Sequence, residues 1–152
     1  MSKLWPLIFA AVFVVVSAVS LVHGFAAPHV MEANQTVIEV RTGSYPICGS
    51  ERRVTCIVDG DTFWLNGTKY RIAGLDTPEV NAPCTRGRIT SARATERLQQ
   101  LMSNATLQLA VTGVDRYGRA LVAVWSNNAL VTDVMISDGV AVRWTGRRHK
   151  WC

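Results

Sequence analysis

The sequence is short of charge, and this already narrows the class of protein. Only 18% of its 152 residues are charged, whereas 49% are apolar. Disordered chains show the opposite balance, so a folded protein is expected. No internal repeat or low-complexity tract occurs. The length suits one domain of roughly 100–150 residues and excludes a large multidomain enzyme.

Familiar metal-binding motifs are also missing. The chain has four cysteines and three histidines. The cysteines include no C-x2-C pair, so their spacing does not favour a zinc site. The acidic residues do not follow the D-x-D-x-D-G pattern of an EF-hand loop. The sequence therefore favours neither a zinc site nor an EF-hand.

The apolar residues concentrate at the N-terminus. Residues 4–22 carry no charge, Lys3 precedes them, and small residues follow. This layout is typical of a secretory signal cleaved after Gly24 or Ala26, so residues 1–24 are interpreted as a signal peptide. A run of this length can also just cross a bilayer, so an uncleaved inner-membrane anchor is the alternative. Because Lys3 stays on the cytoplasmic side, either form sends the rest of the chain outward, as a secreted or periplasmic domain.

Four cysteines in a small exported domain predict disulfide bonds. Outside the cytoplasm the oxidised form is the expected state, and four cysteines allow three pairings. Among these we favour Cys48 with Cys56 and Cys84 with Cys152. No cysteine closely follows the apolar run, so a lipoprotein anchor is not predicted.

The part of the chain after the apolar run divides into two segments. Residues 25–50 mix Pro, Ala, Asn, Gly and Ser with scattered apolar positions, and are interpreted as a linker or loosely docked lead-in. The folded domain is expected at residues 51–152, which hold 14 Lys and Arg against 9 Asp and Glu. The whole net charge of +5 therefore lies on this domain and favours an anionic partner.

Apolar periodicity predicts a domain made mostly of strands. Asn66-Gly67 is the strongest two-residue hairpin signal in the sequence. Short β-branched segments predict strands, and apolar faces at helical spacing predict helices. The expected strands are Val54–Val58, Thr62–Leu65, Thr68–Ala73, Thr106–Val114 and Arg119–Trp125, and the expected helices are Ser91–Met102 and Leu130–Asp138. This content indicates a small β-barrel with packed helices, α+β by class and mainly β.

Four of the nine acids of the domain lie within residues 58–80. Each one alone is most simply a solvated turn former. The two acid-bearing turns lie at the ends of paired strands, however, so the hairpin can bring Asp61 and Asp76 together. Carboxylate oxygens held in this way suit Ca²⁺ or Mg²⁺. The four acids are Asp59, Asp61, Asp76 and Glu79.

Two arginines accompany these acids. Arg71 stands between Tyr70 and Ile72 in an expected strand. If those neighbours face the core, alternation points Arg71 to the opposite face, toward the acids. Arg119 begins another expected strand. An exposed arginine is usually only a solubilising charge, but two beside carboxylates allow a metal and two guanidinium groups to bind one phosphodiester.

Three motifs give the sequence a resemblance to a known family. They are DGDT at 59–62, RIAGLDTPE at 71–79 and DRYGR at 115–119, and the similarity continues through LVTDVMISDGVAVRW at 130–144. In this order and at this spacing they resemble the thermonucleases, the staphylococcal nuclease family. The resemblance covers nearly all of the domain and implies a five-stranded OB-fold barrel that carries two helices.

The resemblance also implies a chemistry and the residues that perform it. Members of the family cleave DNA and RNA with Ca²⁺ and leave 3′-phosphate ends. The residues that would bind Ca²⁺ are Asp61, Asp76 and, through its backbone carbonyl, Thr77. Glu79 would act as general base or position the attacking water, and Arg71 and Arg119 would bind the phosphate. Arg116 and Tyr117, in the third motif, are expected to contact the substrate.

The chain departs from the family pattern near its C-terminal end. The base-stacking tyrosines that follow the position of Gly139 are not matched, and Trp144 is the only aromatic residue there before the tail. No long third helix follows, and residues 147–152 read RRHKWC. This basic tail either extends a nucleic-acid groove or is a solvated segment held by Cys152.

Two other functions remain open at this point. An OB module that binds nucleic acid without catalysis is expected to lack at least one of the five key side chains. An interaction domain with a structural Ca²⁺ would explain the acids but not the paired arginines. All five are present, namely Asp61, Arg71, Asp76, Glu79 and Arg119. We therefore expect an exported, monomeric nuclease that acts on DNA and RNA, with single-stranded or denatured substrates favoured.

Overall fold

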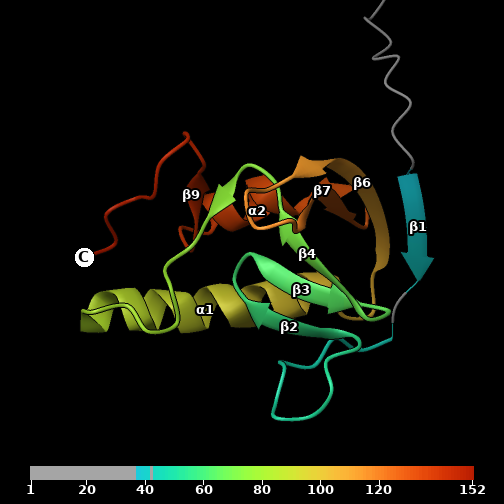
Figure 1. The fold of residues 1–152 in the computed structure, drawn as a ribbon, viewed down its shortest axis with the longest axis horizontal. Helices are drawn as coiled ribbons and strands as arrows, with labels where there is room; N and C mark the ends of the chain where they lie inside the picture. Colours follow the sequence, from blue (N-terminus) through green and yellow to red (C-terminus); the bar gives the residue numbers. More distant parts are fainter. Residues whose placement is uncertain (1–36, 42) are drawn as a thin grey trace, which may run out of the picture. The chain divides into compact units, whose positions relative to one another are not determined.

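The computed structural model describes residues 37–41 and 43–152 of the chain (Figure 1). The expected signal peptide or anchor, residues 1–24, lies outside the described residues, as does the first part of the lead-in. Within the described part, no helix is both long enough and apolar enough to cross a membrane.

The described residues form short strands and two helices. The strands are β1 Val37–Arg41, β2 Cys56–Asp59, β3 Thr62–Leu65, β4 Thr68–Ile72, β5 Leu75–Asp76, β6 Thr106–Val114, β7 Ala120–Ser126, β8 Ala129–Leu130 and β9 Val142–Arg143. The helices are α1 Thr85–Met102 and α2 Val131–Ser137. The prediction of a mainly β domain of the α+β class, with two helices, is confirmed.

Strands β3 and β4 form the hairpin predicted at Asn66-Gly67. Leu65 pairs with Thr68, and the two turn residues have positive φ angles of 50° and 77°. Asn and Gly tolerate this left-handed conformation, which matches the twist of a two-residue hairpin. The hairpin sets a register in which Arg71 lies opposite Thr62, the residue that follows Asp61.

The main sheet does not close into the barrel that the family resemblance implies. Its strands run in the order β1-β6-β7-β4-β3-β2, with β8 paired to β7 (Figure 1). No hydrogen-bonded ladder joins β2 to β6 in the described residues. A closed barrel would pair the free edge of β2 with the free edge of β6. In the structure, β6 already pairs with β1, and Ile57 of β2 already bridges to Ile47. The described residues therefore show a sheet that is extended by β1 and is consistent with an OB-like fold, without showing the closed five-stranded barrel.

A small second sheet joins two segments that are distant in the sequence. β5 pairs in antiparallel fashion with β9, so that Asp76 lies opposite Val142. The backbone N–H of Trp144 donates to the carbonyl of Gly74 at 2.9 Å and extends this contact. The ladder therefore brings the start of the C-terminal segment alongside Asp76.

Helix α1 begins six residues before the predicted start at Ser91. Cys84 caps it, because its sulfur accepts a hydrogen bond from the backbone N–H of Gly87. The first turns have little apolar periodicity, so the sequence pattern shows only the later, amphipathic part of the helix. In Figure 1, α1 overlaps β2 and β3 in the view, and it packs against β2. Its buried side includes Ala94, Leu98 and Met102.

Helix α2 and the five predicted strands agree closely with their predicted positions, whereas the short strands β5, β8 and β9 were not predicted. Gly139 ends α2 with a φ of 68°, as expected for the residue after a helix C-cap. β3 and β6 have the predicted bounds, and β2, β4 and β7 differ from theirs by one or two residues at either end.

Part of the expected lead-in belongs to the fold. β1 pairs with β6, and Tyr45 is fully buried in the core, where its ring meets that of Phe63 at a centroid distance of 6.3 Å. The backbone of Tyr45 also bonds to α1 and its C-cap, through the side chains of Gln99 and Ser103. The folded unit therefore starts before residue 51, because Tyr45 packs against Phe63 and β1 pairs with the edge of β6.

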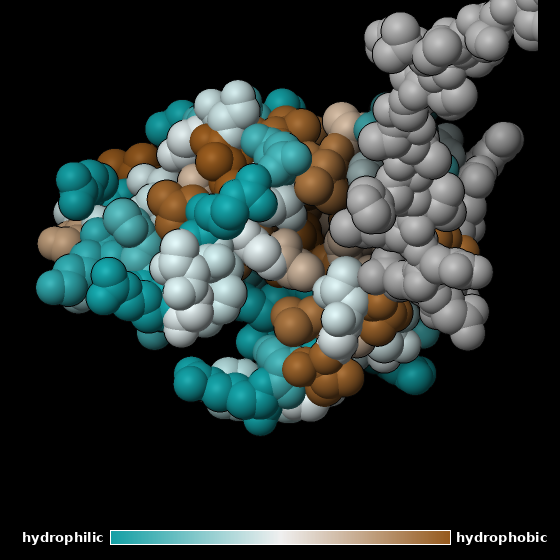
Figure 2. All heavy atoms as spheres, turned by 90° about the horizontal axis from the view of Figure 1, so that it is seen from above, coloured by the Kyte–Doolittle hydropathy of each residue, from teal (hydrophilic) through white to brown (hydrophobic). Residues whose placement is uncertain are grey.

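The surface carries isolated apolar side chains. On the face seen in Figure 2, brown side chains form small groups separated by teal and white ones. The large exposed apolar residues come from several different elements and loops, among them Val80, Val114 and Trp144. Scattered exposed apolar residues are normal for a globular domain and need no partner to explain them.

We predict that Tyr45→Ala destabilises the domain by about 3–5 kcal/mol, the usual cost of deleting a fully buried aromatic side chain. Burial raises the pKa of Tyr45 to about 12. Its hydroxyl has no hydrogen-bond partner among the described residues, so Tyr45→Phe is expected to be neutral or stabilising. Chemical denaturation of the three proteins tests this. Equal stability of Tyr45→Ala and the parent would show that the segment is only a loose lead-in.

Candidate functional site

The first part of the site is an ion pair set up by the β3–β4 hairpin. Nη1 of Arg71 lies 2.7 Å from Oδ1 of Asp61, and the hydroxyl of Thr62 donates to the same oxygen at 2.8 Å. Only 4% of the Asp61 side chain and 13% of the Arg71 side chain are exposed. Arg71 therefore points toward the acids, as strand alternation predicts.

Asp61 is held in a setting that disfavours its negative charge. Burial, and after it the nearby Asp59, raise the pKa of Asp61 to about 7, although Arg71 and the Thr62 hydroxyl act in the opposite direction. Oδ1 of Asp59 accepts a hydrogen bond from the backbone N–H of Asp61 at 3.1 Å, which fixes the turn between them. One guanidinium does not offset the desolvation of this carboxylate, so additional positive charge beside it would favour the ionised form.

Close backbone packing brings the two acid-bearing turns together. A Cβ atom on Gly60 would lie 2.6 Å from Cβ of Ala94 in α1 and 3.0 Å from Cγ2 of Thr77. Both distances are shorter than ordinary contacts, so only glycine fits at this position. Gly60, which precedes Asp61, therefore packs against Thr77, which follows Asp76.

The second part of the site is centred on Asp76, whose side chain is fully buried. Its Oδ2 accepts hydrogen bonds from the backbone N–H of His149 at 2.9 Å and from Nε1 of Trp151 at 3.3 Å. Arg148 places Nη1 3.6 Å from Oδ1 of Asp76 and 3.4 Å from the carbonyl oxygen of Thr77. Arg148 also pairs with the carboxylate of Glu79.

The sequence did not predict that Arg148, His149 and Trp151 belong to this site. A basic run at the end of a chain reads as a solvated tail or as extra charge for a groove. The signal that could have placed it is Cys152, because the structure joins Cys152 to Cys84 with a Cα–Cα distance of 5.8 Å. The structure also joins Cys48 to Cys56, at 5.1 Å, so both bonds follow the favoured pairing.

The four acids do not form a single cluster. Among the described residues, no group of three or more His, Cys, Asp or Glu side chains is placed to hold a metal. Asp59 serves the turn before Asp61, and Glu79 is half-exposed against Arg148. Of the four, Asp61 in the turn before β3 and Asp76 at the end of β5 therefore lie on adjacent segments.

The oxygen atoms of Asp61, Asp76 and Thr77 are suitable ligands for a hard cation such as Ca²⁺. Oδ1 of Asp76 is buried and accepts no hydrogen bond within the described part of the chain. The carbonyl of Thr77 and the carboxylate of Asp61 lie on the two turns that Gly60 packs together. Two carboxylates and a carbonyl are ligands that Ca²⁺ accepts, with its other positions left to water or substrate oxygens.

The turn that precedes β7 holds the second predicted arginine. Nε of Arg119 lies 2.6 Å from Oδ2 of Asp115, and Oδ1 of Asp115 accepts from the backbone N–H groups of Tyr117 and Arg119. Although desolvation raises it, these hydrogen bonds lower the pKa of Asp115 overall. The guanidinium groups of Arg116 and Arg119 lie 4.8 and 5.4 Å from the centre of the Tyr117 ring.

The pairing of β7 with β4 brings Arg119 near the site, but no contact of its side chain with Asp61 or Glu79 is found in the described residues. β7 pairs in parallel with β4, so that Ala120 lies opposite Tyr70 and Leu121 opposite Arg71. The contacts found in the described residues place Arg119 on Asp115 and not on Asp61 or Glu79. The structure therefore places Arg119 directly before β7, the strand that pairs with the strand of Arg71, but joins only Arg71 to an acid of the site.

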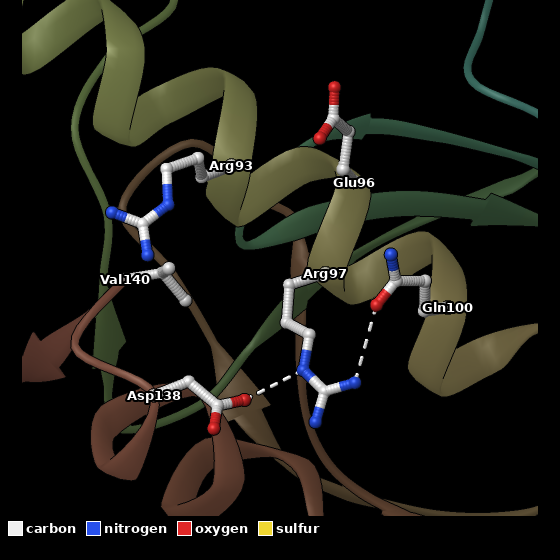
Figure 3. Close-up of a pocket in the computed structure, with 6 residues that line it drawn as sticks. All are labelled: Arg93, Glu96, Arg97, Gln100, Asp138 and Val140. Atoms are coloured by element: carbon white, nitrogen blue, oxygen red, sulfur yellow. Dashed lines mark hydrogen bonds and ion pairs between the residues drawn. The ribbon is translucent and has the colours of Figure 1, made fainter.

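A separate polar pocket lies between α1 and the end of α2 (Figure 3). Nε of Arg97 pairs with Oδ2 of Asp138 at 2.6 Å, and its Nη1 donates to Gln100 at 3.3 Å. The charge of Arg97 is thus already neutralised by a neighbour. The lining residues are Arg93, Glu96, Arg97, Gln100, Asp138 and Val140, none of which was predicted as a site residue.

Comparison with known proteins identifies the domain. A family model described as staphylococcal nuclease homologue matches residues 69–150, which include the Arg71, Asp76 and Arg119 positions. A search of the curated proteins finds no match to the chain.

We predict that Gly60→Ala lowers the free energy of unfolding by about 1–3 kcal/mol, because the methyl group must displace Ala94 or Thr77. Gly113→Ala is the matched control, since a Cβ there would meet nothing within 4 Å. It should change stability by less than about 0.5 kcal/mol. Denaturant unfolding of both variants measures the difference. If the two substitutions cost the same, Gly60 is not the packing point between the turns.

Proposed function

The chain belongs to the staphylococcal nuclease homologue family, and from this premise we propose that it is a Ca²⁺-dependent endonuclease acting outside the cytoplasm. Membership of the family indicates a nuclease or nucleic-acid-binding function. The proposal goes further, to hydrolysis of phosphodiester bonds in DNA and RNA with 3′-phosphate ends. Family resemblance in the motifs at 59–62, 71–79 and 115–119 supports these details.

The packing of Gly60 against Thr77 is the observation that carries the proposal. Through this packing, the turn that contains Gly60 and Asp61 lies against Thr77, the residue that follows Asp76 at the end of β5. Arg71 adds a guanidinium 2.7 Å from Asp61 at the same location. A nuclease needs oxygen ligands and positive charge beside one phosphodiester, and these segments supply both.

The proposed metal ligands are Asp61, Asp76 and the carbonyl of Thr77. A bound Ca²⁺ would supply positive charge and would orient a phosphate oxygen and a water molecule. Glu79 lies two residues after Thr77 and would accept a proton from the attacking water at its carboxylate, once Arg148 releases it.

The arginines have the task of meeting charge on the phosphate. Negative charge builds on the non-bridging oxygens as the new P–O bond forms and the 5′-oxygen leaves. Arg71 would donate hydrogen bonds to one of these oxygens from the hairpin face. Arg119 would reach the substrate from the start of β7, in exchange for its present partner Asp115.

Substrate binding beyond the reacting phosphate is proposed for the turn before β7. Arg116 and Tyr117 are exposed there, and the guanidinium of Arg116 lies over the Tyr117 ring. An aromatic face and a cation suit an unstacked base beside its phosphate, which favours single-stranded or denatured DNA and RNA. The net charge of +5 supports an anionic polymer as partner. We propose that the protein acts as a monomer.

An extracytoplasmic location is also part of the proposal. Residues 4–22 have the composition of a signal or anchor, and both disulfides in the structure need an oxidising compartment. The secreted or periplasmic form and the inner-membrane form differ only in whether the first segment is cleaved. The mass of the protein recovered from the exported fraction would distinguish them.

We predict that Glu79→Gln lowers the cleavage rate at least about a hundredfold, because the amide cannot accept the proton from water. Glu96→Gln is the control, since Glu96 is exposed on α1. Digestion of denatured DNA and of RNA, followed by analysis of the product ends, measures the effect of the substitution. Repeating it with Ca²⁺ or with EDTA measures the metal requirement. Undiminished cleavage in EDTA would contradict the metal requirement. Binding of both polymers without cleavage would favour the non-catalytic OB module instead.

A further inference from the structure

The C-terminal tail, residues 147–152, lies on the acidic site, and its contacts address the two oxygens of Asp76 differently. We propose that this tail sets the calcium affinity of the site. Its Trp151 and His149 hold Asp76 as a ligand, and its Arg148 acts as a tethered cation that Ca²⁺ must displace. The inference rests on the proposed function, because it assumes that Asp76 binds Ca²⁺.

The positioning role follows from Oδ2 of Asp76. Two donors of the tail, the backbone N–H of His149 and Nε1 of Trp151, bond to this oxygen. Their bonds fix the plane of a fully buried carboxylate and leave Oδ1 without a hydrogen bond in the described part of the chain. Partners of this kind behind a metal ligand orient it and raise metal affinity. Trp151 is therefore a positioning residue.

The competing role follows from Arg148. Its guanidinium faces Oδ1 of Asp76 and the carbonyl of Thr77, the same oxygens that would bind the cation, and it pairs with Glu79. A guanidinium and Ca²⁺ at the same oxygens repel each other, so we expect Arg148 to be displaced when Ca²⁺ binds. Its side chain is 47% exposed, and its contacts to Asp76 and Thr77 are 3.6 and 3.4 Å long. A long, half-exposed side chain with loose contacts can move aside while the backbone stays in place.

The tail is fixed at its far end, which makes these contacts part of the fold. Cys152 is bonded to Cys84, the N-cap of α1, and Figure 1 shows the chain ending close to that end of the helix. Arg86 holds the carbonyl of Trp151 through Nε and Nη2, at 3.3 and 3.1 Å. A Cβ on Gly87 would lie 3.0 Å from Sγ of Cys152, so glycine leaves the space that the disulfide needs. The anchored tail returns its side chains to Asp76.

The test is calorimetric titration of the oxidised protein with Ca²⁺ alone, without nucleic acid. Arg148→Gln is expected to tighten Ca²⁺ binding about tenfold, because one unit of competing charge is removed. Trp151→Phe is expected to weaken it about tenfold, because Asp76 loses an orienting bond. Arg147→Gln and Trp144→Phe are the matched controls, since both residues are exposed and neither side chain forms a hydrogen bond or ion pair with Asp76 in the described structure. Each control should bind Ca²⁺ like the parent.

The outcomes separate this inference from the function on which it rests. If the parent binds no Ca²⁺, the proposed function fails and the inference fails with it. If the parent binds Ca²⁺ but Arg148→Gln binds no tighter than Arg147→Gln, only the inference is overturned. Thermal unfolding checks that each variant folds. Should Trp151→Phe not fold, Arg148→Gln still decides, because its side chain is half-exposed and its loss leaves the core intact.

Discussion

The burial of two carboxylates on adjacent segments is the constraint on which the rest of the structure depends. A carboxylate removed from water is stable only with hydrogen-bond donors or positive charge beside it. Asp61 finds these in Thr62 and Arg71, and Asp76 finds them in the C-terminal tail. The β3–β4 hairpin, the β5–β9 ladder and the Cys84–Cys152 disulfide all serve to deliver these partners. Three separate parts of the chain thus meet around one acidic site.

The basic charge of the domain is organised in the same way. The three arginines proposed to act near the site are each held by a carboxylate, Arg71 by Asp61, Arg119 by Asp115 and Arg148 by Glu79. Such pairs keep guanidinium groups in place without placing them deep in the core. On the proposed function, a metal and a phosphate take over these partners, so the site exchanges internal ion pairs for contacts with metal and substrate.

Features that depend on neighbouring residues could be predicted from the sequence, whereas contacts between distant residues could not. The Asn66-Gly67 turn and the end of α2 at Gly139 follow from conformational preference, and the direction of Arg71 toward Asp61 follows from strand alternation. The pairing of β1 with β6, the burial of Tyr45 and the strand order of the sheet depend on which edges find partners, and residue periodicity carries no such information. The contact of the tail with Asp76 depends on a disulfide between residues 68 positions apart. The start of α1 was missed because its first turns carry little apolar periodicity and because its cap is a cysteine.

The central claim is that the segments of Asp61 and Asp76 share one cation position, which Arg148 fills when no metal is bound. The most direct measurement is a crystal structure of the oxidised protein with a lanthanide in place of Ca²⁺, with the ion located by its anomalous scattering. The account predicts one strong anomalous peak in contact with Asp61, Asp76 and the carbonyl of Thr77, with the Arg148 guanidinium moved away and Trp151 still on Asp76. A peak elsewhere, or Arg148 still on Asp76 and Thr77 at saturating metal, would contradict it.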